Sequence, residues 1–268
     1  MEGASAPEAM DRVDIPDRFK LMAGCDFANP LRRTGNWYPA LPPLVQQNSG
    51  LTPMDYFGRV MVEYLPADVR VGVVPVAIGG CGITHLSKSF DPNFAATNSD
   101  RGFSDNFARY DNHPYSRLIT LAKEAQKQGV IKGILFQQGE YDNGDPKWGE
   151  NVKIFYNDVL TDLGLNAEDV PLFAGEVVPV GPCAAHNAAV NALPELIPTA
   201  HVISSADCPA KPGDEIHFSA AGYRIIGGRY AQAALKVLDN NSNVTDADVK
   251  LLFVKNILAY GKKLPRHC

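Results

Sequence analysis

Short apolar segments rich in Val and Ile alternate along the chain with longer segments in which apolar residues recur at helical spacing. Such an alternation is typical of a parallel sheet covered by helices on both faces, because strands buried on both faces read as continuous apolar runs. The sequence therefore predicts an α/β protein, a three-layer α/β/α sandwich with a mostly parallel sheet. The predicted strands are residues 69–78, 131–137, 170–177 and 201–206.

Amphipathic helices are predicted between and after these strands. The clearest helix follows Ser219, whose side chain can cap the first turn, and it ends at the polar run from Asn240 to Asn243. Residues 246–260 again show helical spacing beyond that run. The main predicted helices are residues 115–128, 151–163 and 219–238.

The Asn-rich break divides the chain into one main domain, residues 1–240, and a C-terminal helical extension, residues 241–268. The 268 residues, 45% of them hydrophobic, are enough to bury one sizeable core. Two connections, 26–53 and 79–114, are rich in Gly, Pro, Asn and aromatic residues and exceed ordinary loop lengths. We expect them to be functional loops above the sheet.

The charge pattern argues against nucleic-acid and membrane partners. The formal net charge is -5, and no block of Lys and Arg is present that would neutralise phosphates or an anionic membrane surface. No run of about eighteen apolar residues occurs, and the first residues lack the pattern of a signal peptide. The five cysteines are widely spaced without a Cys-x-x-Cys pair, so we predict no metal site, disulfide framework or cofactor.

The most specific motif is Asp214 to Tyr223, in which an acid precedes a histidine by three residues in a loop before the capped helix. The Asp214 carboxylate can hold the imidazole of His217 in one tautomer while the other ring nitrogen takes a proton from a hydroxyl group. The alternative is that both are polar loop residues, with Asp214 forming a turn.

A second polar motif, Gln137 to Gly144, follows a predicted strand at the end where parallel sheets bind ligands. Gln138 can donate its amide protons to an oxyanion, and Glu140 can orient the histidine or a substrate hydroxyl. The alternative is that Asp142 to Asp145 simply forms a turn.

Glycines follow another predicted strand at Ala77 to Gly82. Gly79 and Gly80 allow backbone N–H groups to approach a ligand closely. A tight turn from strand to loop is the alternative.

These blocks, in this order, resemble the SGNH hydrolase superfamily and, more closely, carbohydrate esterase family six, which contains acetyl xylan esterases and relatives of sialate O-acetylesterases. The resemblance covers roughly residues 1–238 and includes Trp37 to Leu44 and Gly50 to Arg59. It implies a flavodoxin-like sheet and a cofactor-free esterase that acts on acetylated carbohydrates such as acetylated xylan. It also implies an extracellular or secreted location, if the full-length protein follows the family.

By this resemblance, His217 is the general base, Asp214 is its partner and Gly80 is a backbone oxyanion donor, while Gln138 and Glu140 form a third block. In this third block, Tyr141 departs from the small polar residue that the family has after the Glu140 position. This change would alter access to the site or its substrate specificity. Trp37 is a candidate for stacking on a sugar ring, and core packing is its alternative role.

In the family, a first strand leads into Gly-Gln-Ser-Asn-Met-Glu-Gly, whose serine is the nucleophile, and this chain opens with Met1, Glu2 and Gly3. The resemblance implies that the nucleophile and the first strand, which lies inside the order 2-1-3-4-5, precede Met1. We then expect two neighbouring strand edges to be unpaired. The alternatives are an inert carbohydrate-binding protein of the same fold, or a hydrolase that uses another serine. The internal candidates are Ser5, Ser87, Ser204 and Ser205.

Overall fold

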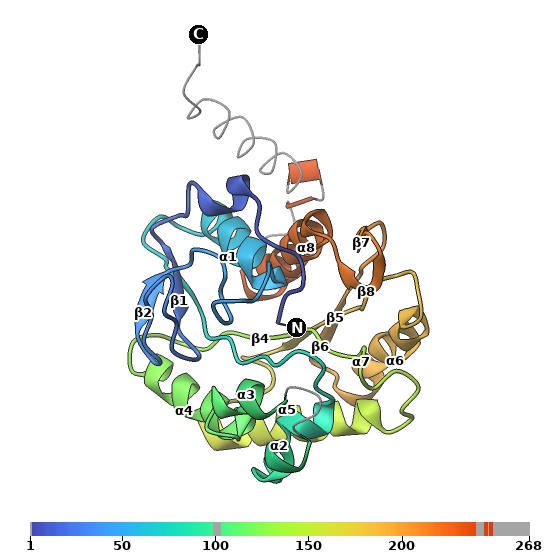
Figure 1. Ribbon diagram of the computed structural model, residues 1–268. Coiled ribbons are helices and arrows are strands. Elements are labelled where there is room, and N and C mark those ends of the chain that lie inside the picture. The colour runs from blue at the N-terminus through green and yellow to red at the C-terminus, as the bar shows by residue number, and fades with distance from the viewer. Residues whose placement is uncertain (1, 99–102, 240–243, 246, 249–268) are drawn as a thin grey trace.

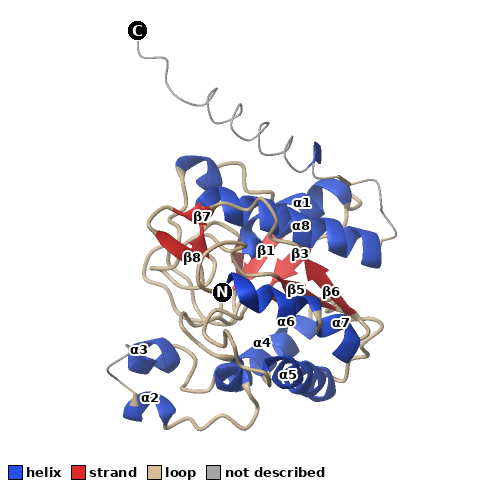
Figure 2. Cartoon of the chain, turned by 90° about the vertical axis from the view of Figure 1, so that its right-hand side faces the viewer, coloured by secondary structure: helices blue, strands red, loops and turns tan. Residues whose placement is uncertain are grey.

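A computed structural model of the protein describes residues 2–98, 103–239, 244–245 and 247–248 (Figure 1). Its layers are seen in Figure 2, where α1 (Pro53–Tyr64) and α8 (Ala220–Leu238) lie on one face of the strands. The opposite face is covered by α4 (Pro114–Gln126) and α5 (Trp148–Leu163). The predicted α/β/α architecture is confirmed.

The strands form two three-stranded sheets and a separate hairpin. In the first sheet, of order β2-β1-β3, the central strand pairs antiparallel with β2 and parallel with β3. The second sheet, of order β4-β5-β6, is parallel throughout. The strands of the first sheet are β1 (Phe19–Met22), β2 (Trp37–Pro39) and β3 (Val71–Val73). Those of the second are β4 (Ile134–Phe136), β5 (Leu172–Gly175) and β6 (Ala200–Ile203).

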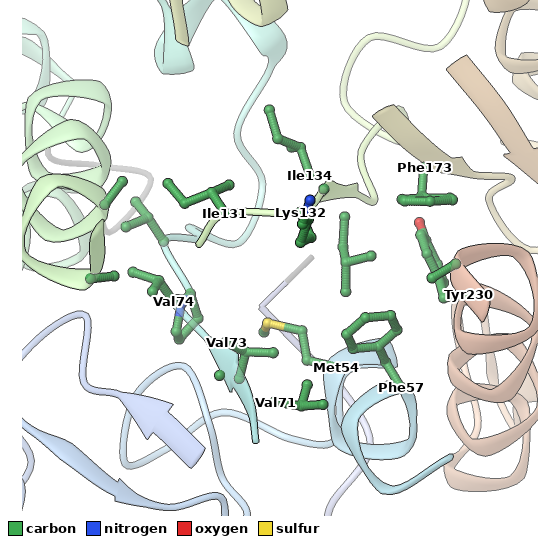
Figure 3. A pocket seen from close by; sticks show the side chains of 18 of the residues that line it. Met54, Phe57, Val71, Val73, Val74, Ile131, Lys132, Ile134, Phe173 and Tyr230 are labelled. Carbon is green, nitrogen blue, oxygen red and sulfur yellow. The ribbon is translucent and has the colours of Figure 1, made fainter. Parts of the chain in front are cut away.

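The sheets are separate because no described strand lies between β3 and β4. Each is the last strand of its own sheet, and an apolar cavity of about 790 Å³ separates their edges (Figure 3). Val71 and Val73 line it from β3, and Ile134 lines it from β4. The two unpaired neighbouring edges that the sequence led us to expect are present.

The predicted helices are confirmed to within a few residues, since they coincide with α4, α5 and α8. Ser219 caps α8 as predicted, and its hydroxyl accepts a hydrogen bond from the Gly222 N–H at 3.1 Å. The expected helix over 246–260 and most of the extension 241–268 lie outside the described residues. The short α-helices are α2 (Phe94–Thr97), α3 (Phe103–Ala108), α6 (Asn187–Asn191) and α7 (Leu193–Leu196). The 3-10 helices are η1 (Ala9–Arg12), η2 (Ile83–Leu86) and η4 (Ala184–His186).

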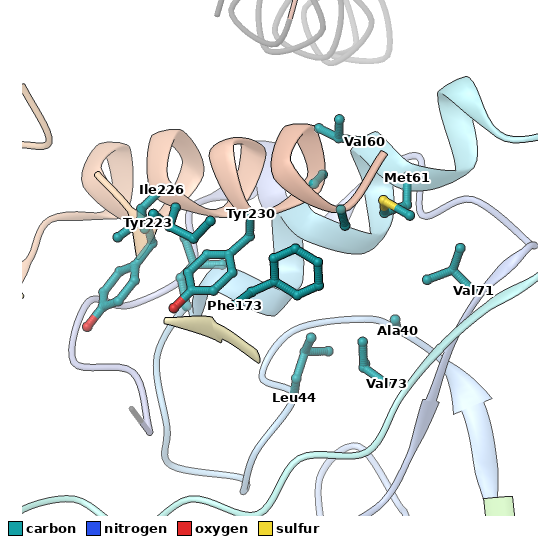
Figure 4. Close-up of a cluster of buried hydrophobic side chains, with 14 of the residues drawn as sticks. Ala40, Leu44, Val60, Met61, Val71, Val73, Phe173, Tyr223, Ile226 and Tyr230 are labelled. Carbon is teal, nitrogen blue, oxygen red and sulfur yellow. The ribbon is translucent and has the colours of Figure 1, made fainter. Parts of the chain in front are cut away.

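Two buried apolar clusters hold the layers together. One lies between α1, α8 and the sheets and includes Tyr230 of α8 and Phe173 of β5, whose rings lie close together (Figure 4). The hydroxyl group of Tyr230 donates to the Phe136 carbonyl at 2.6 Å, so α8 is also hydrogen-bonded to β4. The second cluster, around Trp148 and Phe155 of α5, lies on the opposite face, where α4 and α5 pack against β4, β5 and β6. Burial on both faces explains why β4, β5 and β6 read as apolar runs.

The long connection 79–114 contains η2, α2 and α3, which pack around the buried ring of His85. The ring centroid of Phe94 lies 4.6 Å from that of His85, and Tyr141 approaches it at 5.4 Å from the β4 side. The described parts of this loop therefore form an aromatic cluster around His85. Within the described ranges, no helix is long and apolar enough to cross a membrane.

Candidate active site

The acid and the histidine lie on a short β-hairpin rather than in the loop predicted from the sequence. Strands β7 (Ala210–Lys211) and β8 (Asp214–Phe218) pair antiparallel, and Gly213 makes the turn with a φ of +75°. The hairpin leads directly into the Ser219 cap of α8. The paired backbone therefore fixes both side chains relative to the end of a long helix.

Asp214 and His217 are in direct contact. Nδ1 of His217 lies 2.7 Å from Oδ2 of Asp214, so an ionised carboxylate accepts the Nδ1 proton and leaves Nε2 available as a base. The imidazole is 39% exposed, which leaves Nε2 accessible to a reacting group. This geometry is that of an acid–histidine proton relay.

Two further groups hold the Asp214 carboxylate. The Ile216 N–H donates to Oδ1 at 3.1 Å, and Nζ of Lys211 lies 3.7 Å from Oδ2. Burial alone would raise the pKa of Asp214, but the hydrogen bonds from His217 and the Ile216 N–H lower it below the ordinary value. The carboxylate consequently stays ionised beside the imidazole.

The glycine loop is fixed on both sides of Gly80. The Gly79 N–H donates to the Glu2 carboxylate at 2.6 Å, and the Gly82 N–H donates to Nδ1 of His85 at 2.8 Å. Gly80 itself has a φ of +72°, a conformation that suits glycine. No described residue accepts a hydrogen bond from the Gly80 N–H, so this group remains a candidate oxyanion donor, whereas the Gly79 N–H is already engaged.

Gln138 braces this loop from β4. Its Nε2 donates to the Cys81 carbonyl at 3.1 Å and to Asp142 at 2.5 Å, and its Oε1 accepts from the Trp148 indole N–H at 2.6 Å. Since both amide protons are used within the protein, this arrangement assigns Gln138 to positioning the loop. Direct donation to an oxyanion, as the sequence suggested, would require one of these bonds to break.

Glu140 lies in the same region, close enough to interact electrostatically with His217. Its Oε1 is buried without a hydrogen-bond partner among the described residues. Burial raises the pKa of Glu140, and this effect exceeds the opposing effects of the backbone N–H groups and of His217. This oxygen therefore lacks the hydrogen bond that a buried carboxyl oxygen normally has.

Trp37 lies away from this group, on β2. A Cβ added to Gly72 would come within 2.7 Å of the Trp37 ring, so the indole packs against Gly72 of β3. In Figure 1, β2 and the β7–β8 hairpin stand on opposite sides of the molecule. This contact supports the packing role of Trp37, and the stacking role stays a prediction.

The internal serines have other partners. Ser5 and Ser205 are buried, and their hydroxyls donate to the carbonyls of Phe218 and Val177, both at 2.7 Å. Ser87 pairs with Ser89, and Ser204 contacts Glu176. Within the described residues, no serine hydroxyl is hydrogen-bonded to His217.

Sequence reasoning missed the residues that connect these motifs. The Glu2 carboxylate joins Gly79 to Gln46 through hydrogen bonds of 2.6 and 2.7 Å, and Lys211 joins Asp214 to the Ala4 carbonyl. The contacts of Glu2 and the contact between Lys211 and Ala4 link residues more than forty positions apart, so no local pattern signals them. Asp142 carries a detectable signal, because a buried acid four residues after Gln138 needs a partner.

The part of the chain that the structure describes contains no group of His, Cys, Asp and Glu residues that is able to hold a metal ion. Its four cysteines are buried, and burial raises the pKa of Cys81 to about 12. The Cys81 thiol is therefore a poor nucleophile.

Comparisons with known proteins identify the family of this chain. The sequence profile of the family described as "Carbohydrate esterase, sialic acid-specific acetylesterase" matches residues 23–236. The fold is similar to that of a protein from Arabidopsis thaliana, with a TM-score of 0.64 and 20% identity over 86% of this chain and 84% of that one. It is also similar to a carbohydrate acetylesterase from Xanthomonas citri, with a TM-score of 0.56 and 19% identity over 86% of this chain and 52% of that one. Since the profile covers well over half of the chain, this protein belongs to the carbohydrate esterase family of sialic acid-specific acetylesterases.

Proposed function

We propose that this protein hydrolyses acetyl esters on sugar hydroxyls, such as those of acetylated xylan, with His217 as the general base. The observation that carries the proposal is the 2.7 Å contact between His217 and Asp214, which leaves Nε2 exposed beside the strand ends. Family membership supports the class of substrate. As in the resemblance drawn above, the nucleophile is a serine on a segment that precedes Met1.

The reaction then proceeds in two balanced steps. Nε2 of His217 takes the serine proton as the hydroxyl oxygen attacks the acetyl carbonyl, and the imidazolium returns that proton to the departing sugar oxygen. In the second step, water attacks the acetyl-serine, gives its proton to Nε2, and acetate leaves as the serine is reprotonated. Asp214 stabilises the imidazolium in both steps, and the Gly80 N–H stabilises the negative oxygen of each tetrahedral intermediate.

Glu140 is proposed to bind the sugar near the scissile ester. Its partnerless Oε1 lies near His217, so a substrate hydroxyl that hydrogen-bonds to it would be held close to the relay. Tyr141, which is 46% exposed, is positioned to border this site. These residues would determine which acetylated hydroxyl is accepted.

The test is to extend the chain in frame upstream of Met1 and to measure acetate release from acetylated xylan and from a small aryl acetate. His217→Ala should reduce kcat by about a thousandfold or more. His113→Asn is the matched control, because it replaces a histidine that caps α4 with another good capping residue. Full activity of His217→Ala would rule out the proposed base.

The second candidate function is carbohydrate binding without catalysis. It is favoured by the absence of a hydrogen bond between His217 and any described serine hydroxyl. In that case the protein that starts at Met1 would bind acetylated xylan oligosaccharides without releasing acetate. A stop codon in place of a strand and a serine immediately upstream would support this alternative.

A further inference from the structure

The position of the Gly80 N–H depends on the peptide groups that follow it in the glycine loop. This loop belongs to no helix or strand, so side chains hold it in place. The Gly82 N–H donates to Nδ1 of His85 at 2.8 Å. The next N–H, that of Ile83, donates to the Asp142 carboxylate at 2.7 Å. These two bonds fix the second half of the loop, and the bond to His85 is the nearer of the two to Gly80.

The loop also packs closely against aromatic rings. A Cβ added to Gly82 would lie 2.6 Å from Oδ1 of Asp142 and 2.8 Å from the ring of Tyr141. A Cβ added to Gly80 would lie 3.8 Å from the ring of Phe103, which belongs to the cluster around His85. A change at His85 is therefore transmitted to Gly80 both through the backbone and through the rings that the loop contacts.

The imidazole of His85 has to be neutral to accept this hydrogen bond. An Nδ1 atom that accepts carries no proton, so the ring proton is on Nε2. A second proton, on Nδ1, would turn the acceptor into a donor that faces the Gly82 N–H. Because two donors 2.8 Å apart cannot hydrogen-bond to each other, protonation of His85 would break this contact and release Gly82.

The surroundings of His85 keep the ring neutral near pH 7. It is 6% exposed, and the charged group that acts on it from the described residues is Asp142. Burial lowers the pKa of His85 below the ordinary 6.5, and this effect exceeds the opposing effect of Asp142. On its other side, η2 packs on α4 and α5 through Ile83 and Leu86. The rings that face His85 are those of Phe90, Phe94, Phe103, Phe107 and Tyr141.

We propose that His85 is a positioning residue that holds the oxyanion donor in place while it is neutral and releases it when it is protonated, so that the glycine loop is an acid-sensitive switch. The inference rests on the proposed function for the role of the Gly80 N–H. Two histidines must then be neutral for the reaction. His217 takes the serine proton, and His85 keeps the loop in its active position.

NMR of the 268-residue chain tests the switch without any substrate. With ¹⁵N-labelled histidine and glycine, the Gly82 amide signal should shift in one acidic transition that coincides with protonation of the His85 ring. His85→Asn should abolish this transition, because the Asn side-chain oxygen can accept the same N–H and does not titrate. His113→Asn is the matched control, since Nδ1 of His113 also accepts a backbone N–H, from Ser116 at 3.2 Å. A Gly82 signal that does not follow the titration of His85 would overturn the proposal.

Kinetics of the extended chain test the consequence for catalysis. Protonation of the general base alone gives a slope of about one in the acidic limb of log kcat against pH, and a second required histidine makes the limb steeper, approaching about two. His85→Asn should return the slope to about one. His85→Phe, which keeps a ring but has no acceptor, should lower kcat by about tenfold or more with little change in KM. A slope of one in the unmodified protein, or full kcat in His85→Phe, would contradict the positioning role.

The two experiments separate this inference from the proposed function. A Gly82 transition that follows His85, in a protein whose extended chain releases no acetate, would leave the loop switch standing and remove the proposed chemistry. Acetate release with a stationary Gly82 signal and a slope of one would remove only the switch.

Discussion

At the scale of single residues, the site depends on charges that are held in fixed positions. Asp214 is kept ionised by His217 and the Ile216 N–H, whereas burial raises the pKa of Glu140. When their environments shift the pKa values of two carboxyl groups in opposite directions, one can remain an anion while the other exchanges a proton. This difference is the chemical basis for assigning them different roles.

Asp55 offers a residue-scale prediction about stability. It is 1% exposed, its Oδ1 has no hydrogen-bond partner among the described residues, and burial raises its pKa from 3.8 to about 7, despite the hydrogen bonds from Thr52. Because the folded protein binds this proton more tightly than the unfolded chain, the free energy of unfolding should fall as pH rises from about 4 to 7. In Asp55→Asn, the fall in the free energy of unfolding over this pH range should be smaller by about 2 to 4 kcal/mol.

Urea denaturation of both proteins at several pH values provides the measurement. The difference between their free energies of unfolding isolates Asp55, because the other titrating groups are shared. Asp207→Asn is the control, since Asp207 is exposed and its φ of +60° is readily adopted by Asn. A difference between wild type and Asp55→Asn that stays constant across this pH range would show that Asp55 is already ionised in the folded protein.

At the scale of elements, α1 and α8 pack closely because a glycine lies at their contact. A Cβ added to Gly227 would lie 2.4 Å from the Pro53 carbonyl oxygen and 3.0 Å from the Tyr56 side chain. Gly227→Ala should force the helices apart and lower the free energy of unfolding by about 1 to 3 kcal/mol. Gly129→Ala is the matched control, since nothing lies within 4 Å of its added Cβ. Equal Tm values for the two variants would contradict the close packing of α1 and α8 at Gly227.

The elements also show what sequence patterns can predict. Helices α4, α5 and α8 and the segments that contain β3 to β6 were predictable because each has an apolar pattern set by the layer it packs against, whereas α1 was not predicted. β1, β2, β7 and β8 were missed because none of them is a continuous apolar run: β1 and β7 contain Lys, β2 ends in Pro, and β8 begins with two acids. His217 and Asp214 could be paired from the sequence because they are three residues apart. The role of Gln138 in positioning the glycine loop could not be predicted, because it depends on contacts with Cys81 and Trp148.

At the scale of the whole molecule, the first residues connect parts of the fold that are distant in sequence. Glu2 contacts the glycine loop, Ala4 contacts Lys211, and Asp11 contacts Arg224 of α8. Residues 2–12 therefore run from the candidate site, beside the cavity between β3 and β4, to the layer that contains α1 and α8. Its attachment should determine how well the two sheets are held together.

An ion pair attaches this segment to α8. Arg224 donates from Nε and Nη2 to the two carboxylate oxygens of Asp11 at 2.9 and 2.8 Å, and Asp11 is 0% exposed. Arg224→Met would leave that buried charge unpaired and should lower the free energy of unfolding by about 3 to 5 kcal/mol. Adding Asp11→Asn should restore part of the loss, because the charge is then removed together with its partner.

The pH dependence distinguishes this ion pair from simple loss of packing. Burial alone would raise the pKa of Asp11, but Arg224 and Tyr56 lower it below its ordinary value, so the pair stabilises the protein above that value and the stabilisation is lost as pH falls. In Arg224→Met the deficit should therefore shrink below about pH 4, where Asp11 becomes protonated. A deficit that is independent of pH and unaffected by Asp11→Asn would mean that the aliphatic contacts of Arg224, and not its charge, hold the first segment on α8.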